Sequence, residues 1–313
     1  MTHRFLHLLL IFLMPVALLN CTQAQTLNGF DISDATVSQD KIKQGGPPRD
    51  GIPSIDTPDF INPEEADWLR DEDRVLALKR NGVAKAYPIR ILDWHEVVND
   101  TFGDEAIVVT WCPLCGSGMA FESEVEGQVL EFGVSGLLYN SDVLLFDRQT
   151  ESLWSQIGTK AITGEFQDKK LTQVPMEHTS WKAWSKQHED TKVLSKNTGH
   201  DRNYDRDPYS GYENEERLYF PVTDTDDRLP LKEWVLGISV DGDAKAYAFS
   251  DLKEKESPFS DKIGSKEITI SFDAENESAS AYDENGDAIP TLTAFWFAWY
   301  AFHPETELFA HED

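Results

Sequence analysis

The sequence has little cysteine and little positive charge. Only 3 of its 313 residues are cysteine, and 28 lysine and arginine residues stand against 56 aspartate and glutamate residues. Three thiols are too few for a disulfide-stapled scaffold or for a zinc ribbon, which takes four ligands from two knuckles. A formal net charge of −28 argues against nucleic acid or an anionic lipid surface as a partner, because either would repel the chain.

Long hydrophobic runs are also scarce. The one apolar run, residues 8–19, is too short to span a bilayer and is followed by small and polar residues. We therefore predict a secretory signal over residues 1–24, and a periplasmic or extracellular protein. Leu18 to Cys21 resembles a bacterial lipobox, which would make Cys21 a lipid anchor and the only membrane contact. Thr22 to Ala24 offers an ordinary cleavage site instead, so both outcomes stay open.

Two of the three cysteines are three positions apart, in Cys112-Pro113-Leu114-Cys115-Gly116. A β-branched run, residues 107–111, leads into this motif and residues 119–121 lead away from it, which predicts thiols on a hairpin knuckle. This spacing suits one metal ion bound by both sulfurs, a disulfide that opens and closes, or a static disulfide that braces the turn.

Two parts of the chain resemble each other. Residues 75–87 return at 235–247, and a later block with two tryptophans, a histidine and a threonine also returns. The members of that block are Trp181, Trp184, His188 and Thr191, matched by Trp296, Trp299, His303 and Thr306. This pattern predicts an α+β fold, mostly antiparallel sheet, with two tandem related copies packed together.

The predicted organisation follows from these matches. It consists of an extended N-terminal arm at 25–66, a first copy at 67–200 with an insertion after Phe121, an acidic connector at 201–230 and a degenerate second copy at 231–313. Asn81-Gly82 and Asp241-Gly242 predict hairpin turns, and helices are predicted over 91–99 and 181–188.

The second copy lacks counterparts of Cys112, Cys115 and His95. Because the scaffold residues repeat and these three do not, we predict that they form a metal site with one open coordination position. Thiolates and an imidazole outside the cytoplasm would suit copper or zinc. The histidines present in both copies, His188 and His303, are interpreted as structural.

The insertion carries more polar groups than plain strands require. Tyr139 and Arg148 could bind an anionic substrate beside the knuckle, with Asp142 or Asp147 as proton acceptor, so Tyr139, Asp142 and Arg148 join the cysteines as candidate catalytic residues. The alternative is a set of turn caps and an Asp–Arg pair. No Ser-His-Asp order or glycine-rich phosphate loop supports a hydrolase or a nucleotide cofactor.

Several motifs together resemble a known family. They are Gly45-Gly-Pro-Pro-Arg-Asp-Gly-Ile-Pro53, Asp93-Trp-His95-Glu, Trp111-Cys-Pro-Leu-Cys-Gly116, Phe132-Gly-Val-Ser-Gly-Leu-Leu-Tyr-Asn-Ser-Asp142 and Ser152-Leu-Trp-Ser-Gln156. The chain is similar to the bacterial secreted proteins grouped as domain of unknown function 3179, and this resemblance implies a location outside the cytoplasm.

The functional prediction therefore rests on the chemistry of the knuckle. We predict a metal-dependent or thiol-dependent oxidoreductase that acts on an unidentified small molecule or redox partner. The alternative is a non-catalytic module of the cell envelope, which delivers a metal or binds a partner and uses the cysteines as a structural disulfide.

Overall fold

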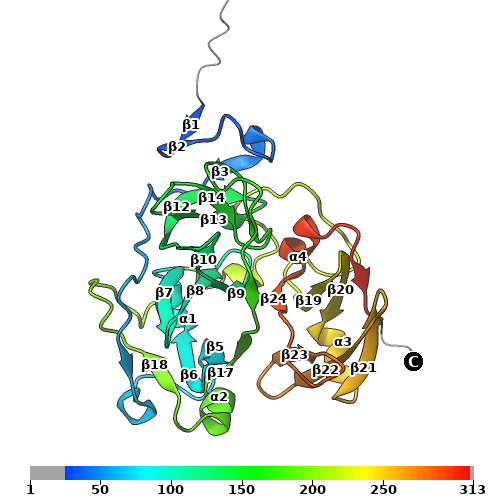
Figure 1. The fold of residues 1–313 in the computed structure, drawn as a ribbon. Coiled ribbons are helices and arrows are strands. Elements are labelled where there is room, and N and C mark those ends of the chain that lie inside the picture. The colour runs from blue at the N-terminus through cyan, green and yellow to red at the C-terminus, as the bar shows by residue number, and fades with distance from the viewer. Residues whose placement is uncertain (1–24, 311–313) are drawn as a thin grey trace, which may run out of the picture.

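The computed structural model describes residues 25–310, which are mostly β-structure, with 40% of residues in strands and 12% in helices. Five larger sheets of three to five strands make up the molecule, with the architecture of a five-bladed β-propeller (Figure 1). The predicted α+β fold of two packed copies is therefore wrong.

We number the sheets I to V and give their strands in spatial order. Sheet I is β17 (Glu177–Ser180), β5 (Arg74–Arg80), β6 (Val83–Pro88), β18 (Lys192–Leu194) and β4 (Phe60–Ile61). Sheet II is β16 (Gln173–Val174), β9 (Ser117–Glu122), β8 (Glu105–Cys112) and β7 (Val97–Phe102). Sheet III is β15 (Lys160–Ala161), β14 (Leu153–Ser155), β13 (Asp142–Asp147), β12 (Phe132–Tyr139) and β3 (Ile42–Gln44).

Two further sheets, two small ribbons and the helices complete the described part of the chain. Sheet IV is β24 (Leu292–Phe295), β19 (Trp234–Val240), β20 (Asp243–Ala248) and β25 (Glu307–Leu308), and sheet V is β21 (Phe259–Ile263), β22 (Lys266–Asp273) and β23 (Ser278–Tyr282). Two small ribbons are β1 (Thr26–Leu27) with β2 (Phe30–Asp31), and β10 (Glu124–Val125) with β11 (Gln128–Val129). The helices are α1 (Ile89–Leu92), α2 (Trp181–Gln187), α3 (Phe249–Glu254), α4 (Trp296–Phe302) and the 3₁₀ turns η1 (Gln39–Lys41), η2 (Pro63–Glu65) and η3 (Tyr212–Asn214).

The strongest local signals in the sequence formed as predicted. Asn81-Gly82 joins β5 to β6 with φ of 52° and 79°, as a two-residue hairpin requires, and Asp241-Gly242 joins β19 to β20 in the same way. Helix α2 also matches its prediction. The helix predicted over 91–99 is wrong, since α1 ends at Leu92 and β7 begins at Val97. The β-branched side chains at the start of β7 are fully buried, which favours a strand there.

The matching sequence blocks lie in sheets I and IV. The Trp184 indole donates a hydrogen bond to Thr191 Oγ1 at 2.8 Å, and the Trp299 indole donates to Thr306 Oγ1 at 2.9 Å. His188 and His303 occupy the C-cap positions of α2 and α4. These residues are structural, as predicted.

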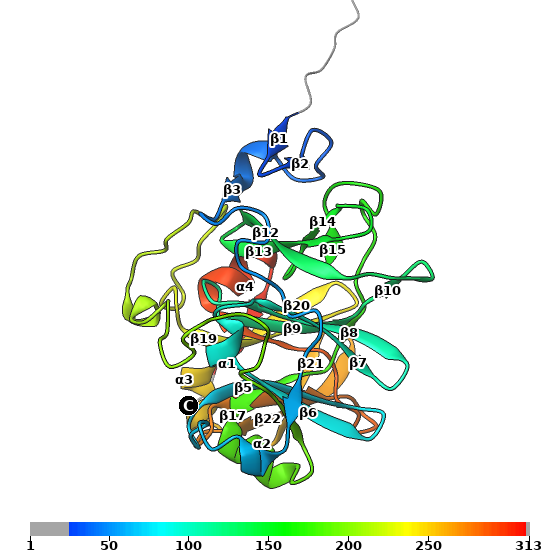
Figure 2. The same cartoon turned by 90° about the vertical axis from the view of Figure 1, so that its left-hand side faces the viewer.

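The core explains why a division into two packed halves fails. The largest hydrophobic cluster contains Cys112 and Cys115 of sheet II together with Trp154 of sheet III, Val235 of sheet IV and Trp296 of α4. Residues on both sides of the expected boundary therefore share one core. The insertion forms most of sheet III, which the arm strand β3 completes at one end of the molecule, opposite α2 (Figures 1 and 2).

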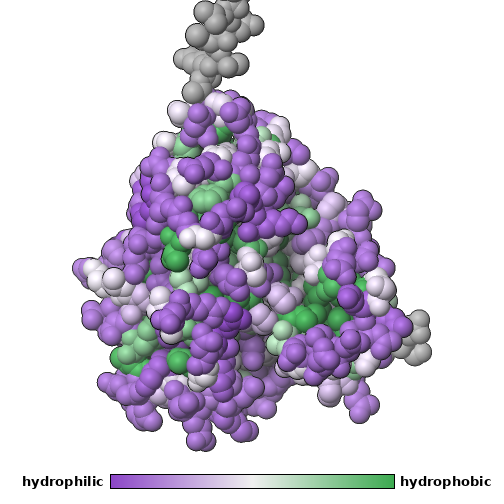
Figure 3. Space-filling model, in the orientation of Figure 1, coloured by the Kyte–Doolittle hydropathy of each residue, from purple (hydrophilic) through white to green (hydrophobic). Residues whose placement is uncertain are grey.

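The predicted signal and the lipobox at Cys21 lie outside the described residues and stay predictions. Among residues 25–310, no helix has the length and apolar character needed to cross a bilayer. The face drawn in Figure 3 is mostly hydrophilic, in keeping with the acidic composition.

Candidate metal centre at the cysteine knuckle

The cysteine motif forms the predicted knuckle between β8 and β9. Cys112 pairs with Ser117 across the hairpin, and the Cys115 amide donates to the Cys112 carbonyl at 3.2 Å. Gly116 has a φ of +61°, in the left-handed region that glycine adopts readily. Both thiols are free and buried, with 2% of Cys112 and none of Cys115 exposed.

The hairpin between β12 and β13 carries Asp142 to these thiols. Its two-residue loop is Asn140-Ser141, with φ of 53° and 66°, so two non-glycine residues adopt left-handed conformations. Asn140 fixes the loop by donating to the Ala301 carbonyl at 3.0 Å and accepting from the Thr223 amide at 2.9 Å. Backbone strain that is held in this way often marks a functional site.

The result is a compact group of ligand atoms. The sulfurs of Cys112 and Cys115 and a carboxylate oxygen of Asp142 all lie within 4.8 Å of one another, and no other such group of three occurs among residues 25–310. In a tetrahedral zinc site, ligand atoms at usual bond lengths are separated by about 3.5–3.8 Å. A closure of roughly 1 Å would therefore bring the three atoms to coordinating positions.

Several polar atoms around this group lack partners. Asp142 Oδ2 accepts from the Ile157 amide at 3.0 Å, but Asp142 Oδ1 is buried without a hydrogen-bond partner. Ser141 Oγ and the Tyr212 hydroxyl are also buried without partners. Buried polar atoms are normally satisfied, so an orphaned carboxylate oxygen beside two thiols is the arrangement expected of a site for a cation.

A buried hydrogen-bond network supports the knuckle from behind. Ser117 Oγ donates to Gln156 Oε1 at 2.7 Å, and Gln156 Nε2 donates to Thr110 Oγ1 at 2.8 Å. These hydrogen bonds link Ser117, the first residue of β9, and Thr110 of β8 to Gln156, which directly follows β14. Hydrogen bonds of this kind hold the strands that carry the thiols in fixed orientations.

The electrostatics of the site favour protonated groups unless a cation is present. Burial raises the pKa of Asp142 to about 7, and burial together with nearby Asp93 raises the pKa of Glu96 to about 8. Burial also raises the pKa of the Cys112 thiol, and that of Cys115 well above its ordinary value. None of these groups has a positive charge among the causes of its shift, so the thiols are poor nucleophiles.

Three residues beside the thiols were missed as site residues. Glu96 is buried with a φ of +58° and forms a hydrogen bond with Tyr209. Tyr212 is close enough to both thiols that their charges would raise its pKa. Glu96 follows His95 in a motif where only the histidine was predicted as a ligand, and the two tyrosines come from the connector at 201–230, which is rich in acidic residues.

His95 does not join the cysteines. Its Nδ1 contacts the Pro53 carbonyl at 2.7 Å and its Nε2 contacts the Tyr204 hydroxyl at 2.7 Å, so both ring nitrogens have partners. It is also absent from the group of convergent ligand atoms. The predicted grouping of His95 with Cys112 and Cys115 does not form, and the ionisable side chain that lies beside the two thiols is Asp142.

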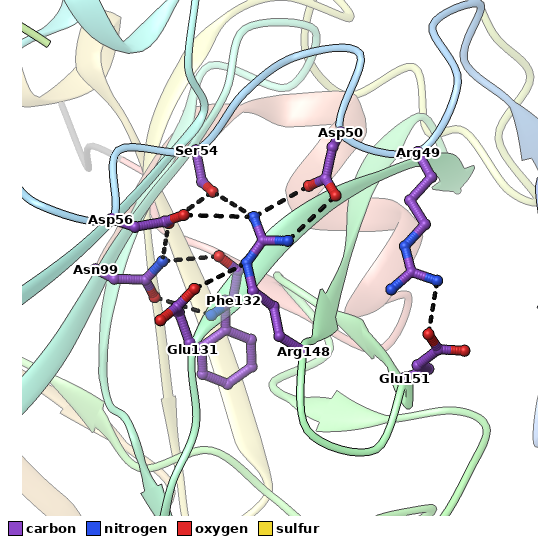
Figure 4. A network of polar contacts seen from close by, with 9 residues as sticks. All are labelled: Arg49, Asp50, Ser54, Asp56, Asn99, Glu131, Phe132, Arg148 and Glu151. Atoms are coloured by element: carbon purple, nitrogen blue, oxygen red, sulfur yellow. Dashed lines mark hydrogen bonds and ion pairs between the residues drawn. The ribbon is translucent and has the colours of Figure 1, made fainter. Parts of the chain in front are cut away.

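Arg148 is held by two acids of the N-terminal arm and by Glu131, which directly precedes β12 (Figure 4). Its guanidinium lies 3.1 Å from Asp50, 3.5 Å from Asp56 and 3.0 Å from Glu131. Arg148 follows β13 at the end opposite to Asp142, six residues along, which is about 20 Å in an extended strand. The structure therefore does not bring Arg148 to the knuckle, and its charge is already compensated.

Tyr139 and Asp147 also have structural partners. The Tyr139 ring packs edge-on against Phe302, with centroids 5.7 Å apart. Asp147 accepts from the Thr150 amide at 2.6 Å and from the Trp154 indole at 2.9 Å, so it caps the turn after β13. Neither belongs to the group of convergent ligand atoms.

Comparison with known proteins gives one match. The family model described as Protein of unknown function (DUF3179) matches residues 49–306, which is most of the chain. The chain belongs to this family. Residues 49–306 include the knuckle, the hairpin with Asp142 and the connector tyrosines. No curated protein and no solved structure matches the chain.

Proposed function

We propose that this protein binds one divalent transition-metal ion, with zinc as the best fit, through Cys112, Cys115 and Asp142. The observation that carries the proposal is the convergence of two thiols on a buried carboxylate that has an oxygen without a partner. A bound cation would satisfy that oxygen and would stabilise the thiolates that burial otherwise disfavours.

The donor set supports zinc over copper. Thiolates are soft ligands that both metals accept, whereas a carboxylate is a hard ligand that suits zinc and adds little for copper(I). Three protein ligands leave a fourth tetrahedral position for water or an exogenous ligand. Glu96, which interacts electrostatically with both Cys112 and Asp142, could exchange a proton with such a ligand.

The two thiol alternatives have less support. A redox pair works best with a low thiol pKa, but burial and the neighbouring acids raise the pKa of Cys112 and Cys115. A static brace needs a disulfide, and both cysteines are free. An extracytoplasmic location remains part of the proposal, and it would expose the site to zinc from the environment.

Elemental analysis of protein purified anaerobically tests the proposal. We expect close to one metal ion per chain in the native protein, and a large loss of metal in Cys112→Ser and Asp142→Asn. Asp56→Asn is the matched control, because Asp56 is half-exposed in the Arg148 network and should keep its metal. Native protein without metal, or equal metal content in Asp142→Asn and Asp56→Asn, would contradict the proposal.

A further inference from the structure

A cavity of about 420 Å³ lies beside the knuckle, and Pro113 and Gly116 form part of its wall. Its volume falls within the range of small-molecule sites. The knuckle packs closely at this wall, because a Cβ added at Gly116 would lie 2.6 Å from the Trp234 ring. A ligand in the cavity would therefore lie next to the candidate metal centre, but it would contact the residues of the cavity wall and not a metal ion.

Aromatic rings in mutual contact line the cavity. The His178 ring meets Trp111 and Trp234 edge-on, with centroid distances of 5.5 Å in both pairs, and Trp234 packs on Phe295 at 4.5 Å. Three of these four residues are large hydrophobic rings, and aromatic faces carry partial negative charge. This wall suits an apolar or cationic group rather than an anion.

Acidic residues outnumber basic ones in the rest of the lining. Asp93, Asp207, Glu213 and Glu277 line the cavity, and Arg74 is the one lysine or arginine that does. The Asp93 carboxyl accepts from the Trp111 indole at 2.8 Å, and Glu213 accepts from the Trp234 indole at 2.9 Å. These two acids therefore sit at the edges of the rings. Burial raises the pKa of Asp93 to about 7, and Glu277 is paired with Lys253 at 2.7 Å, so Asp207 and Glu213 supply most of the negative potential.

The Arg74 guanidinium is already in use. It donates to the backbone carbonyls of Asn276 at 2.6 Å, His178 at 2.9 Å and Glu277 at 3.0 Å. These bonds hold β17 and the turn before β23 together. An anionic ligand would have to compete with them and would face the carboxylates of Asp207 and Glu213, so the cavity disfavours anions.

Two buried polar groups of the lining have atoms without partners. His178 is 5% exposed and its Nδ1 has no hydrogen-bond partner, and Tyr212 is 1% exposed with an unpartnered hydroxyl. Burial and the nearby Arg74 charge hold the pKa of His178 well below its ordinary value, so the imidazole is neutral. A neutral ring nitrogen and a phenol oxygen can both accept hydrogen bonds from a ligand N–H.

We propose that this cavity binds a small organic ammonium ion that keeps at least one N–H, with its apolar part against the rings of Trp111, Trp234 and Phe295. The carboxylates of Glu213 and Asp207 supply the opposite charge. Such a ligand combines cation–π attraction with charge complementarity and satisfies the unpartnered acceptors. A hydrated divalent metal ion gains nothing from aromatic walls.

Calorimetric titration with a matched set of probes tests this. Benzylammonium, benzyl alcohol and benzoate share a ring and differ in charge. Benzylammonium should bind at least about tenfold tighter than benzyl alcohol, and benzoate should show no binding. Benzyltrimethylammonium, which has the charge but no N–H, should bind more weakly than benzylammonium. Equal binding of the alcohol, or tighter binding of benzoate, would overturn the proposal.

Variants locate the site. Glu213→Gln should weaken benzylammonium binding several-fold while leaving benzyl alcohol unchanged, and Trp234→Leu should weaken both. Trp68→Leu is the matched control, because Trp68 does not line the cavity. If Trp234→Leu does not fold, Glu213→Gln still decides the question. A Glu213→Gln protein that binds benzylammonium as tightly as the native protein would refute a role for this cavity.

The Cys112→Ser/Cys115→Ser double variant separates this proposal from the metal site. It should keep benzylammonium binding, since the cavity contacts involve no thiol. If binding disappears from the folded variant, the amine was a metal ligand and the proposal fails. Competition between zinc and benzylammonium in this variant would show that the cavity takes metal ions instead, and would also overturn it.

Discussion

The pH dependence of zinc binding should report the number of protons that the ligands lose. Zinc binds thiolate and carboxylate, not the protonated forms, so metal and protons compete for Cys112, Cys115 and Asp142. The pKa of both thiols is raised by burial, and that of Asp142 is raised to about 7. At neutral pH, binding must therefore displace two thiol protons and part of a carboxyl proton.

The magnitude follows from these pKa values. Each displaced proton raises the apparent affinity about tenfold per pH unit, so the two thiols together contribute roughly a 10⁴-fold increase between pH 6 and pH 8. Asp142, with a pKa of about 7, adds roughly another tenfold over the same range. We expect a rise of about 10⁵-fold for the native protein and about 10⁴-fold for Asp142→Asn.

Competition with a chromophoric zinc chelator, calibrated for its own protonation at pH 6, 7 and 8, measures both series. The informative quantity is the affinity ratio between native protein and Asp142→Asn. It should grow about tenfold from pH 6 to pH 8, because only the native protein has the carboxyl to deprotonate. A ratio that stays constant would show that Asp142 is not a ligand, and a rise in the native protein well short of about a hundredfold per pH unit would exclude two thiolates.

Three further outcomes are expected. The metal-free protein should lose stability from pH 5 to pH 8, because buried carboxyl groups with a raised pKa are favoured by the fold only while they are protonated. They must ionise in place as the pH passes about 7 for Asp142 and about 8 for Glu96, and the loss for Asp142 alone is limited to about 4 kcal/mol. Calorimetry should show a Tm that falls with pH and that zinc restores. A flat or rising Tm would contradict the described burial. His95→Gln should lower unfolding free energy by about 1–3 kcal/mol without changing zinc content, whereas metal loss in the folded variant would restore His95 as a ligand. Arg148→Met should expose the arm around residues 45–63 to proteolysis while zinc binding stays unchanged, and unchanged proteolysis would show that the network of Figure 4 does not hold the arm.

Local patterns predicted the knuckle well. The β-branched run before Cys112 favours a buried strand, and a C-x-x-C motif between two strands leaves the thiols at a turn. Hairpins marked by Asn-Gly and Asp-Gly were equally clear, because both residues of such turns need left-handed conformations.

The position of Asp142 beside the thiols could not be predicted from its surroundings in the sequence. The turn before Asp142 is Asn140-Ser141, which lacks the glycine that usually marks a two-residue hairpin, and tertiary contacts of Asn140 hold it. Asp142 was a candidate for proton transfer, but nothing in the sequence places it beside the thiols. His95 was predicted as a ligand because it has no counterpart in residues 231–313. The lack of a counterpart does not indicate which way the His95 side chain points.

The fold prediction failed where the local period was ambiguous. Residues 91–99 suit a helix as well as a strand, and burial of Val97 and Val98 against other sheets decides for β7. The polar groups of the insertion favoured a substrate site there, but its alternating residues build most of sheet III. Because that sheet shares a core with α4 and β19, long-range packing determines the architecture, and a comparison of the chain with itself does not predict it.

X-ray absorption at the zinc edge tests the central claim most directly. In the zinc-loaded protein, two sulfur ligands should appear at about 2.3 Å and one or two oxygen or nitrogen ligands at about 2.0–2.2 Å, with the sulfur contribution halved in Cys112→Ser. A shell of oxygen and nitrogen alone, or four sulfurs from a site shared between chains, would contradict a centre built from Cys112, Cys115 and Asp142.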